Sequence, residues 1–293
     1  MSINFVRYPF HYLYVNIIHP RISNFRYFNI LSKNLELKNS MEGKRAFIIG
    51  GGPSLKNINL AKLKDEQTFA LNEFDQNPKF NEVLPKNYLI IDSSYYTLGD
   101  DHYLTEQFQK KGKSLPEDTV LFINVSAKNF IEKNKMFTGH KLYYVAMEGI
   151  YSDKLPLNID IDEVVPRPKN SILMALVIAT YMGFEEIYLL GCEHNFLSMN
   201  IGSKKFTYEH SYNDPRANID PNDTELIKKY TNPRDLTLTY EKQIMNVKQL
   251  FKNYRLFWQK VQKEHPKTKI YNATPDSFLD VFPKIDFDKI PLK

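Results

Sequence analysis

Residues 46–55 read Ala-Phe-Ile-Ile-Gly-Gly-Gly-Pro-Ser-Leu. The four apolar residues from Ala46 to Ile49 predict a short buried strand, and the three glycines after them predict a tight turn. The polar stretch around Asn57 is typical of the start of a helix. A strand, a glycine turn and a helix start, in this order, indicate the opening unit of an α/β fold.

The rest of the chain alternates in the same way. Between Ser171 and Met182 apolar residues recur at helical spacing, and Gly183 ends this helix before the next strand. We therefore expect a Rossmann-like, doubly wound α/β fold, with a mostly parallel sheet and helices on both faces. Apolar runs predict its further strands at residues 68–71, 88–91, 120–124, 141–145, 186–190 and 269–272.

Three segments stand outside this alternation. Residues 198–238 lack a sustained apolar period and are too long for a simple connection, so we interpret them as a lid or substrate loop. Residues 238–264 predict a long amphipathic helix. We expect three parts along the chain: an N-terminal extension at 1–45, a main domain at 46–283 and a C-terminal tail at 284–293.

The extension at 1–45 interleaves aromatic residues with arginine and lysine and carries almost no acid. We expect it to be helical and basic. Two interpretations stay open. The helix packs its aromatic side chains on the main domain or on a partner subunit, as in a homo-oligomer, or it rests on the anionic surface of a lipid bilayer.

The composition is that of a soluble globular protein, since 42% of the 293 residues are hydrophobic and 25% are charged. The formal net charge of +5 favours an anionic ligand or membrane surface and does not require nucleic acid. The single cysteine, Cys192, excludes an intramolecular disulfide and a cysteine-cluster metal site. With no apolar run of about 18 residues and no secretory signal, we expect a cytoplasmic protein, peripheral at most to the inner face of the membrane.

The loop at Gly50, Gly51, Gly52 and Ser54 is a candidate anion site. Glycines let backbone N–H groups approach a phosphate closely, and the start of a helix adds a favourable dipole. The spacing matches neither a P-loop nor a dinucleotide fingerprint. A tight strand-to-helix turn without a ligand is the alternative interpretation.

Polar side chains also follow several of the predicted strands. The carboxyl ends of parallel strands meet at one edge of the sheet, where ligands gather in doubly wound folds. Each residue alone is equally typical of a helix cap or a turn. Taken together, they predict a site that includes Asn72, Asp92, Ser93, Asn124, Glu193 and His194.

Two histidines, His194 and His210, are candidate general bases, because an imidazole can accept a proton near neutral pH. A structural role is the alternative for each. The acidic triplets at 160–162 and 286–288 are weak signals for a divalent metal. We expect no metal.

The quoted segments resemble the bacterial family-42 sialyltransferases and the broader set of surface-polysaccharide and flagellin-glycosylation proteins that includes the motility accessory factors. The resemblance covers roughly residues 45–283. It is carried by the glycine-Pro-Ser-Leu opening, by Asn72 within Ala-Leu-Asn-Glu-Phe, by Asn170-Ser171 with the helix and strand after it, and by residues 271–277.

The resemblance implies a Rossmann-like catalytic domain that transfers a nonulosonic acid, such as sialic acid, from a CMP-activated donor without metal. The acceptor would be a glycan or glycolipid such as lipopolysaccharide or capsule. Asn72, Asn170 and Ser171 match positions that hold the donor. In this mechanism a histidine deprotonates the acceptor hydroxyl and two tyrosine hydroxyls stabilise the departing phosphate.

The chain departs from the family pattern in two places. Gly51 stands where the family has an asparagine, and no histidine occurs between Leu236 and His265, where the family has its base. The resemblance therefore makes His210 the first candidate for the base and His194 the second. The candidate phosphate partners are Tyr208 and Tyr212.

Two other functions stay open. The opening motif is also similar to that of archaeal 6-hydroxymethylpterin diphosphokinases, which use ATP and Mg²⁺, and for which Asp92 and Glu193 would become metal ligands. A non-catalytic assembly protein that keeps the fold is the third interpretation.

Overall fold

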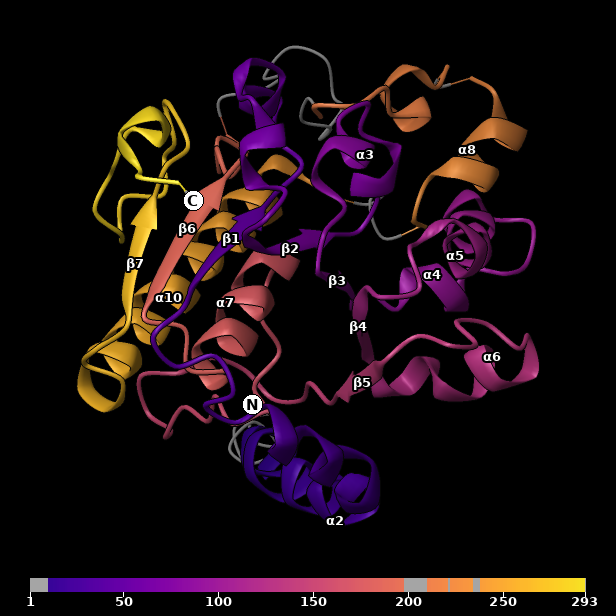
Figure 1. Ribbon diagram of the computed structural model, residues 1–293. Coiled ribbons are helices and arrows are strands. Elements are labelled where there is room, and N and C mark those ends of the chain that lie inside the picture. Colours follow the sequence, from indigo (N-terminus) through magenta and orange to yellow (C-terminus); the bar gives the residue numbers. More distant parts are fainter. Residues whose placement is uncertain (1–9, 198–209, 221, 234–237, 293) are drawn as a thin grey trace.

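The computed structural model describes residues 10–197, 210–220, 222–233 and 238–292. In this part of the chain, seven strands form one sheet in the order β5-β4-β3-β2-β1-β6-β7, and every neighbouring pair is parallel (Figure 1). This confirms the predicted fold class. The strands are β1 (Arg45–Ile49), β2 (Gln67–Leu71), β3 (Asn87–Ile90), β4 (Val120–Asn124), β5 (Leu142–Val145), β6 (Glu186–Leu190) and β7 (Lys269–Asn272).

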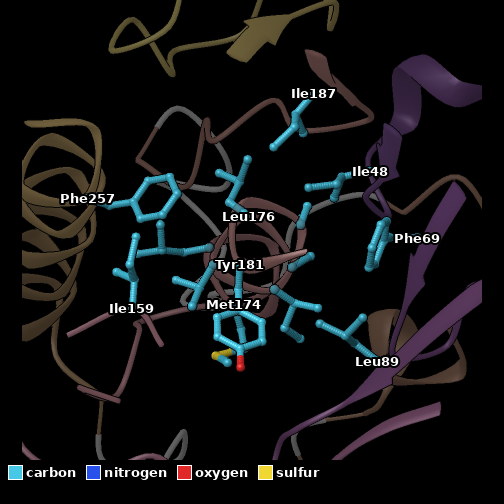
Figure 2. Packing of buried hydrophobic residues seen from close by; sticks show 14 of the residues in the cluster. Ile48, Phe69, Leu89, Ile159, Met174, Leu176, Tyr181, Ile187 and Phe257 are labelled. Carbon is cyan, nitrogen blue, oxygen red and sulfur yellow. The ribbon is translucent and has the colours of Figure 1, made fainter. Parts of the chain in front are cut away.

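Helices cover both faces of the sheet, because successive residues of a buried strand point to opposite sides. On one face, Ile48 and Phe69 pack against α7 (Ser171–Tyr181) and α10 (Tyr240–Glu264), as Figure 2 shows for the labelled core residues. On the other face, Phe47 and Ile49 pack in a second core. The elements that contribute to it include η3 (Pro53–Asn57), η4 (Leu60–Leu63), η5 (Phe74–Gln76), α3 (Phe80–Val83), α4 (Ser94–Thr97), α5 (Tyr103–Ser114), η6 (Val125–Ala127), α6 (Lys128–Lys133) and η8 (Phe287–Lys289).

The strand order reverses at β1. The chain leaves β1 toward β2 and continues outward to β5, and then it returns through α7 to β6 on the other side of β1. In doubly wound folds, ligands gather at the carboxyl ends of the strands on either side of such a reversal. The glycine loop follows β1, and Glu193 and His194 follow β6.

The described part of the 198–238 segment is more ordered than its polar composition indicates. It holds η7 (Pro215–Asn218) and α8 (Thr224–Tyr230), and α8 begins where the Asp223 side chain accepts a hydrogen bond from the N–H of Leu226. The ring of Tyr230 packs against Tyr103 of α5. A cap and one aromatic contact stabilise a helix too short to show an apolar period.

The two ends of the chain both pack on the domain. The C-terminal segment from residue 284 pairs with β7 through Lys284 and buries Phe287 and Ile290, so it is part of the core and not a separate tail. The N-terminal extension forms the π-helical turn η1 (Tyr14–Ile18), α2 (His19–Leu31) and η2 (Ser32–Leu37) beside β5. Within the described residues, no helix is both long and apolar enough to cross a bilayer.

Candidate functional site

The glycine loop lies against the end of β6. Ile49 pairs with Leu190, which brings Gly50 level with Gly191 and Gly52 level with Glu193. A Cβ atom on Gly50 would overlap the Gly191 carbonyl, and one on Gly52 would overlap the Glu193 carboxylate. Close approach of these neighbours explains why the sequence has glycine at both positions.

The Glu193 carboxylate lies at the start of η3, where the glycine loop is predicted to bind a phosphate. This buried carboxylate accepts a hydrogen bond of 2.8 Å from the N–H of Ser54, at the start of η3. That N–H group is therefore already used, and the negative charge beside it repels a phosphate. The hydroxyl of Ser54 is buried and has no hydrogen-bond partner within the described residues.

The segment that begins at His210 folds back onto the glycine loop. The N–H of Ser211 donates to the Gly51 carbonyl at 2.8 Å, and the amide of Asn77 donates to the Ser211 hydroxyl at 2.8 Å. The His210 ring stacks on Tyr212, with 4.7 Å between ring centroids. Its Nδ1 would lie 3.2 Å from a Cβ on Gly51, so this nitrogen faces the glycine loop.

A row of buried charges supports His210 from the other side. Its Nε2 lies 3.3 Å from Oδ2 of Asp214, and Asp214 accepts from the Arg216 guanidinium at 2.7 Å. Arg216 also lies 3.4 Å from the Glu73 carboxylate, to which the Tyr95 hydroxyl donates. The carboxylate of Asp214 is thus held beside the imidazole by a fixed cation.

Burial lowers the pKa of His210, and the Arg216 charge adds to this, while the Asp214 carboxylate and the Gly51 carbonyl oppose it. Burial alone would raise the pKa of the Asp214 carboxyl, but its hydrogen bonds and charge attraction to Arg216 outweigh burial and lower it. At neutral pH the pair is therefore a neutral imidazole beside a carboxylate. This is the form in which a histidine can accept a proton.

His194 lies in a closed environment. Its Nδ1 lies 2.9 Å from the Cys192 carbonyl and its Nε2 lies 2.9 Å from the Tyr254 hydroxyl, so both nitrogens are used within the protein. The amide of Asn170 lies 3.2 Å from the same Nε2. Burial lowers the pKa of His194 to about 4. Its partners are a carbonyl, a hydroxyl and an amide, with no carboxylate paired to the ring among the described residues, and this fits a structural role better than that of a base.

The start of α7 brings together three of the predicted donor-binding residues. Asn170 caps the helix by accepting from the N–H of Leu173, and the Ser171 hydroxyl donates to Oδ1 of Asn72 at 3.2 Å. Asn72 has a φ of 52°, and His194 has a φ of 55°. Non-glycine residues adopt this left-handed conformation rarely, and such residues cluster at functional sites.

Other predicted residues serve the structure around the site. Asp92 follows β3, one strand further out than Asn72. Its carboxylate accepts a hydrogen bond from the N–H of Ser94 at the start of α4, and Ser93 lies between them in the sequence. Asn124 lies two strands from β2 and caps η6. Tyr208 lies outside the described residues. Whether any of these contacts a ligand stays a prediction.

The acidic triplets lie in ordinary surroundings. Asp160 pairs with Lys38 at 3.2 Å, and Asp288 pairs with Lys62 at 2.9 Å. Asp286 caps η8. Among the described residues, no three His, Cys, Asp or Glu side chains gather as a metal site would require.

Sequence reasoning did not find Glu73, Asn77, Asp214, Arg216 or Tyr254. Glu73 directly follows Asn72, and Asp214 is four residues from His210, so a search for charged residues near each candidate would have found both. Tyr254 lies within the amphipathic helix predicted at residues 238–264. Its hydroxyl, which a buried tyrosine must pair, was the signal that it also bonds a neighbour.

Three solved structures are similar to this chain. Two are structures of the sialyltransferase CstII from Campylobacter jejuni. The complex with cytidine-5'-monophosphate shows 17% identity over 83% of this chain and 85% of that chain, with a TM-score of 0.41. The complex with CMP-3FNeuAc shows 15% identity over the same shares, with a TM-score of 0.38.

The third is the MAf glycosyltransferase from Magnetospirillum magneticum AMB-1, with 9% identity over 91% of this chain and a TM-score of 0.46. This chain spans 39% of that one. These proteins come from the two sets that the sequence resembles. No sequence profile of a protein family matches the chain, and no curated protein matches it.

Proposed function

We propose that the protein is a glycosyltransferase that moves a nonulosonic acid from a CMP-activated donor to a surface glycan, without metal and with His210 as the general base. The observation that carries this proposal is the placement of the His210–Asp214 pair against the glycine loop, at the carboxyl ends of β1 and β6. A neutral imidazole held by a carboxylate, at the ligand-binding edge of the sheet, is suited to take a proton from a hydroxyl.

The surroundings favour one orientation of the nucleotide. The Glu193 carboxylate can accept hydrogen bonds from the two hydroxyls of a ribose, but it repels a phosphate. The phosphate fits better at the start of α7, where the helix dipole, Asn72 and Ser171 supply favourable partners for an anion. Asn170, which contacts His194 and Tyr254, keeps this helix start in place.

In the proposed reaction, the imidazole of His210 takes the proton from the acceptor hydroxyl while that oxygen attacks the anomeric carbon of the donor sugar. The bond between this carbon and the phosphate oxygen breaks, and CMP leaves with the electron pair. Asp214 stabilises the imidazolium that forms, and the Gly51 carbonyl also favours the protonated ring. We assign Tyr212, and also Tyr208, to the departing phosphate, as the resemblance implies.

Thermal unfolding with CMP, UDP, GDP and ATP, each in EDTA and in Mg²⁺, tests the nucleotide. A ligand that binds only the folded state raises the melting temperature. We expect CMP to raise it in EDTA, and Asn72→Ala and Ser171→Ala to reduce the shift. A shift with ATP that requires Mg²⁺ would contradict the proposal in favour of a diphosphokinase, and no shift with any nucleotide would favour an assembly protein.

A further inference from the structure

The side of the N-terminal extension that faces the protein combines polar side chains with a small apolar cluster around Leu31. Asn34 is fully buried, and its amide donates to the carbonyls of Tyr144 and Ile161 at 2.8 and 2.6 Å. The hydroxyl of Ser23 donates to the Glu148 carboxylate at 2.8 Å. At two other positions of the extension, the side chains of Asn16 and Asn24 accept hydrogen bonds from the backbone N–H groups of residues 150 and 164.

The apolar side of the same helix faces away from the protein. The ring of Phe25 is 90% exposed. Because residues three and four apart lie on one side of a helix, the spacing of these side chains makes a continuous stripe opposite the buried asparagines. We call this stripe the outer face; its members, each at least 43% exposed, are Phe10, Tyr14, Ile18, Ile22, Phe25 and Phe28.

This arrangement does not fit the interpretation in which the aromatic side chains pack on the main domain, because Phe10, Phe25 and Phe28 would then be buried. Instead, asparagine and serine side chains and the buried Leu31 fix the extension, and these three rings are left in solvent. A contiguous apolar surface of this kind is rare on a soluble protein and marks an interaction surface.

The helix that carries the outer face has basic residues and no acidic ones. From residue 10 to residue 35 the sequence contains no aspartate or glutamate. Arg21 lies within the outer face by helical spacing, and Arg26 lies along its flank. If two copies of this face packed on each other, their arginines would face one another across a dry interface, which is costly.

We propose that the outer face binds the surface of an anionic lipid bilayer, with its aromatic and aliphatic side chains in the interfacial region and Arg21 and Arg26 among the lipid headgroups. Cationic side chains beside large apolar ones are the combination that holds a helix in the plane of such a surface. Figure 1 shows α2 at the margin of the molecule, where a flat surface can reach it.

Acidic residues mark where the bound part of the helix ends. A shallow groove of about 230 Å³ lies between Phe25, Phe28 and Leu35 on one side and Asp162 and Glu163 on the other. These carboxylates would be repelled by anionic headgroups. The segment after Phe28 therefore stays at the water side of the interface, and Phe25 and Phe28 lie at the boundary of the bound segment 10–28.

Flotation of the purified full chain with vesicles tests this inference. We expect the protein to float with vesicles of phosphatidylethanolamine and phosphatidylglycerol, to remain behind with phosphatidylcholine alone, and to be released by high salt. The triple variant Ile22→Ser, Phe25→Ser, Phe28→Ser should lower the bound fraction at least about 10-fold. The double variant Arg21→Gln, Arg26→Gln should weaken binding to anionic vesicles only.

Phe278→Ser is the matched control, because Phe278 is an exposed phenylalanine outside the extension. It should bind vesicles as the unchanged protein does, and all variants should melt at the same temperature. Equal flotation of the triple variant, or no flotation of the unchanged protein, would overturn the inference. So would a dimer that the triple variant abolishes, because the face would then bind a second copy. None of these outcomes depends on which nucleotide the protein binds.

Discussion

The surroundings of His194 and His210 differ, although both histidines lie at the same edge of the sheet. His194 follows β6 directly and bonds through both nitrogens to Cys192 and Tyr254. His210 comes from a distant segment, stacks on Tyr212 and faces Asp214 with one nitrogen and the glycine loop with the other. One environment is closed and holds the strand end in place. The other has the partners of a general base.

This difference shows that burial and lowered pKa do not by themselves mark the catalytic group. Burial lowers the pKa of both histidines. What separates them is the partners of each nitrogen. Burial keeps His194 neutral although the Cys192 carbonyl opposes this, whereas a carboxylate beside His210 stabilises the imidazolium that catalysis would form.

The largest expected effect is on turnover. His210→Ala should slow CMP release from CMP-N-acetylneuraminate by about 10²-fold or more, because a positioned general base contributes at least that much. The affinity for CMP should stay nearly unchanged. His11→Ala, at an exposed histidine near the start of the extension, is the control. Full turnover in His210→Ala would remove the distinction between the two histidines.

The next effect is on stability at low pH and concerns His194. Its pKa is about 4 in the folded protein and 6.5 ordinarily, so the unfolded chain binds the proton first as the pH falls. The stability it contributes is complete above pH 6.5 and is lost as the pH falls through 4. At pH 5 this loss is about 2 kcal/mol.

Urea unfolding at pH 7 and pH 5 measures this loss. His194→Asn keeps a residue that tolerates the left-handed backbone and removes the titrating group. Between pH 7 and pH 5, the free energy of unfolding of this variant should fall by about 2 kcal/mol less than that of the unchanged protein. The same dependence in both proteins would show that His194 is not the group responsible.

The smallest effect is expected at Tyr254. Tyr254→Phe removes one hydroxyl that bonds His194 and Asn170, and it should cost about 1 kcal/mol of stability. Turnover should change little, since the ring still packs in the core. The melting temperature and the rate of CMP release check this. A large loss of turnover at unchanged stability would place Tyr254, and with it His194, in the reaction.

The fold could be predicted because its signals are local. Strands buried on both faces are continuous apolar runs, and the bounds of β4, β6 and β7 are those predicted. The helix α8 could not be predicted from an apolar period, because seven residues with a cap and one aromatic contact show none. The exposure of the aromatic side of α2 could also not be predicted, because composition does not tell which side of a helix faces the protein.

The candidate site was predictable in part, for a related reason. Asn72, Glu193 and His194 follow strands, so the sheet itself determines where they lie. His210 could be named, but its contact with Gly51 depends on how a segment 160 positions away folds back, as the bond from Ser211 to Gly51 shows. The contact of His210 with Asp214, and that of Asp214 with Arg216, also depend on how this segment folds, and no short sequence motif predicts them.

The dependence of kcat/KM on pH tests the central claim most directly, because it reports the pKa of the group that takes the proton. The claim predicts that the rate falls as acid protonates His210, with a midpoint below pH 6.5, since burial lowers this pKa. Asp214→Asn removes a carboxylate that raises it, so the midpoint should move lower still, while His194→Asn should leave it in place. A midpoint that moves with His194→Asn and not with Asp214→Asn would contradict the claim.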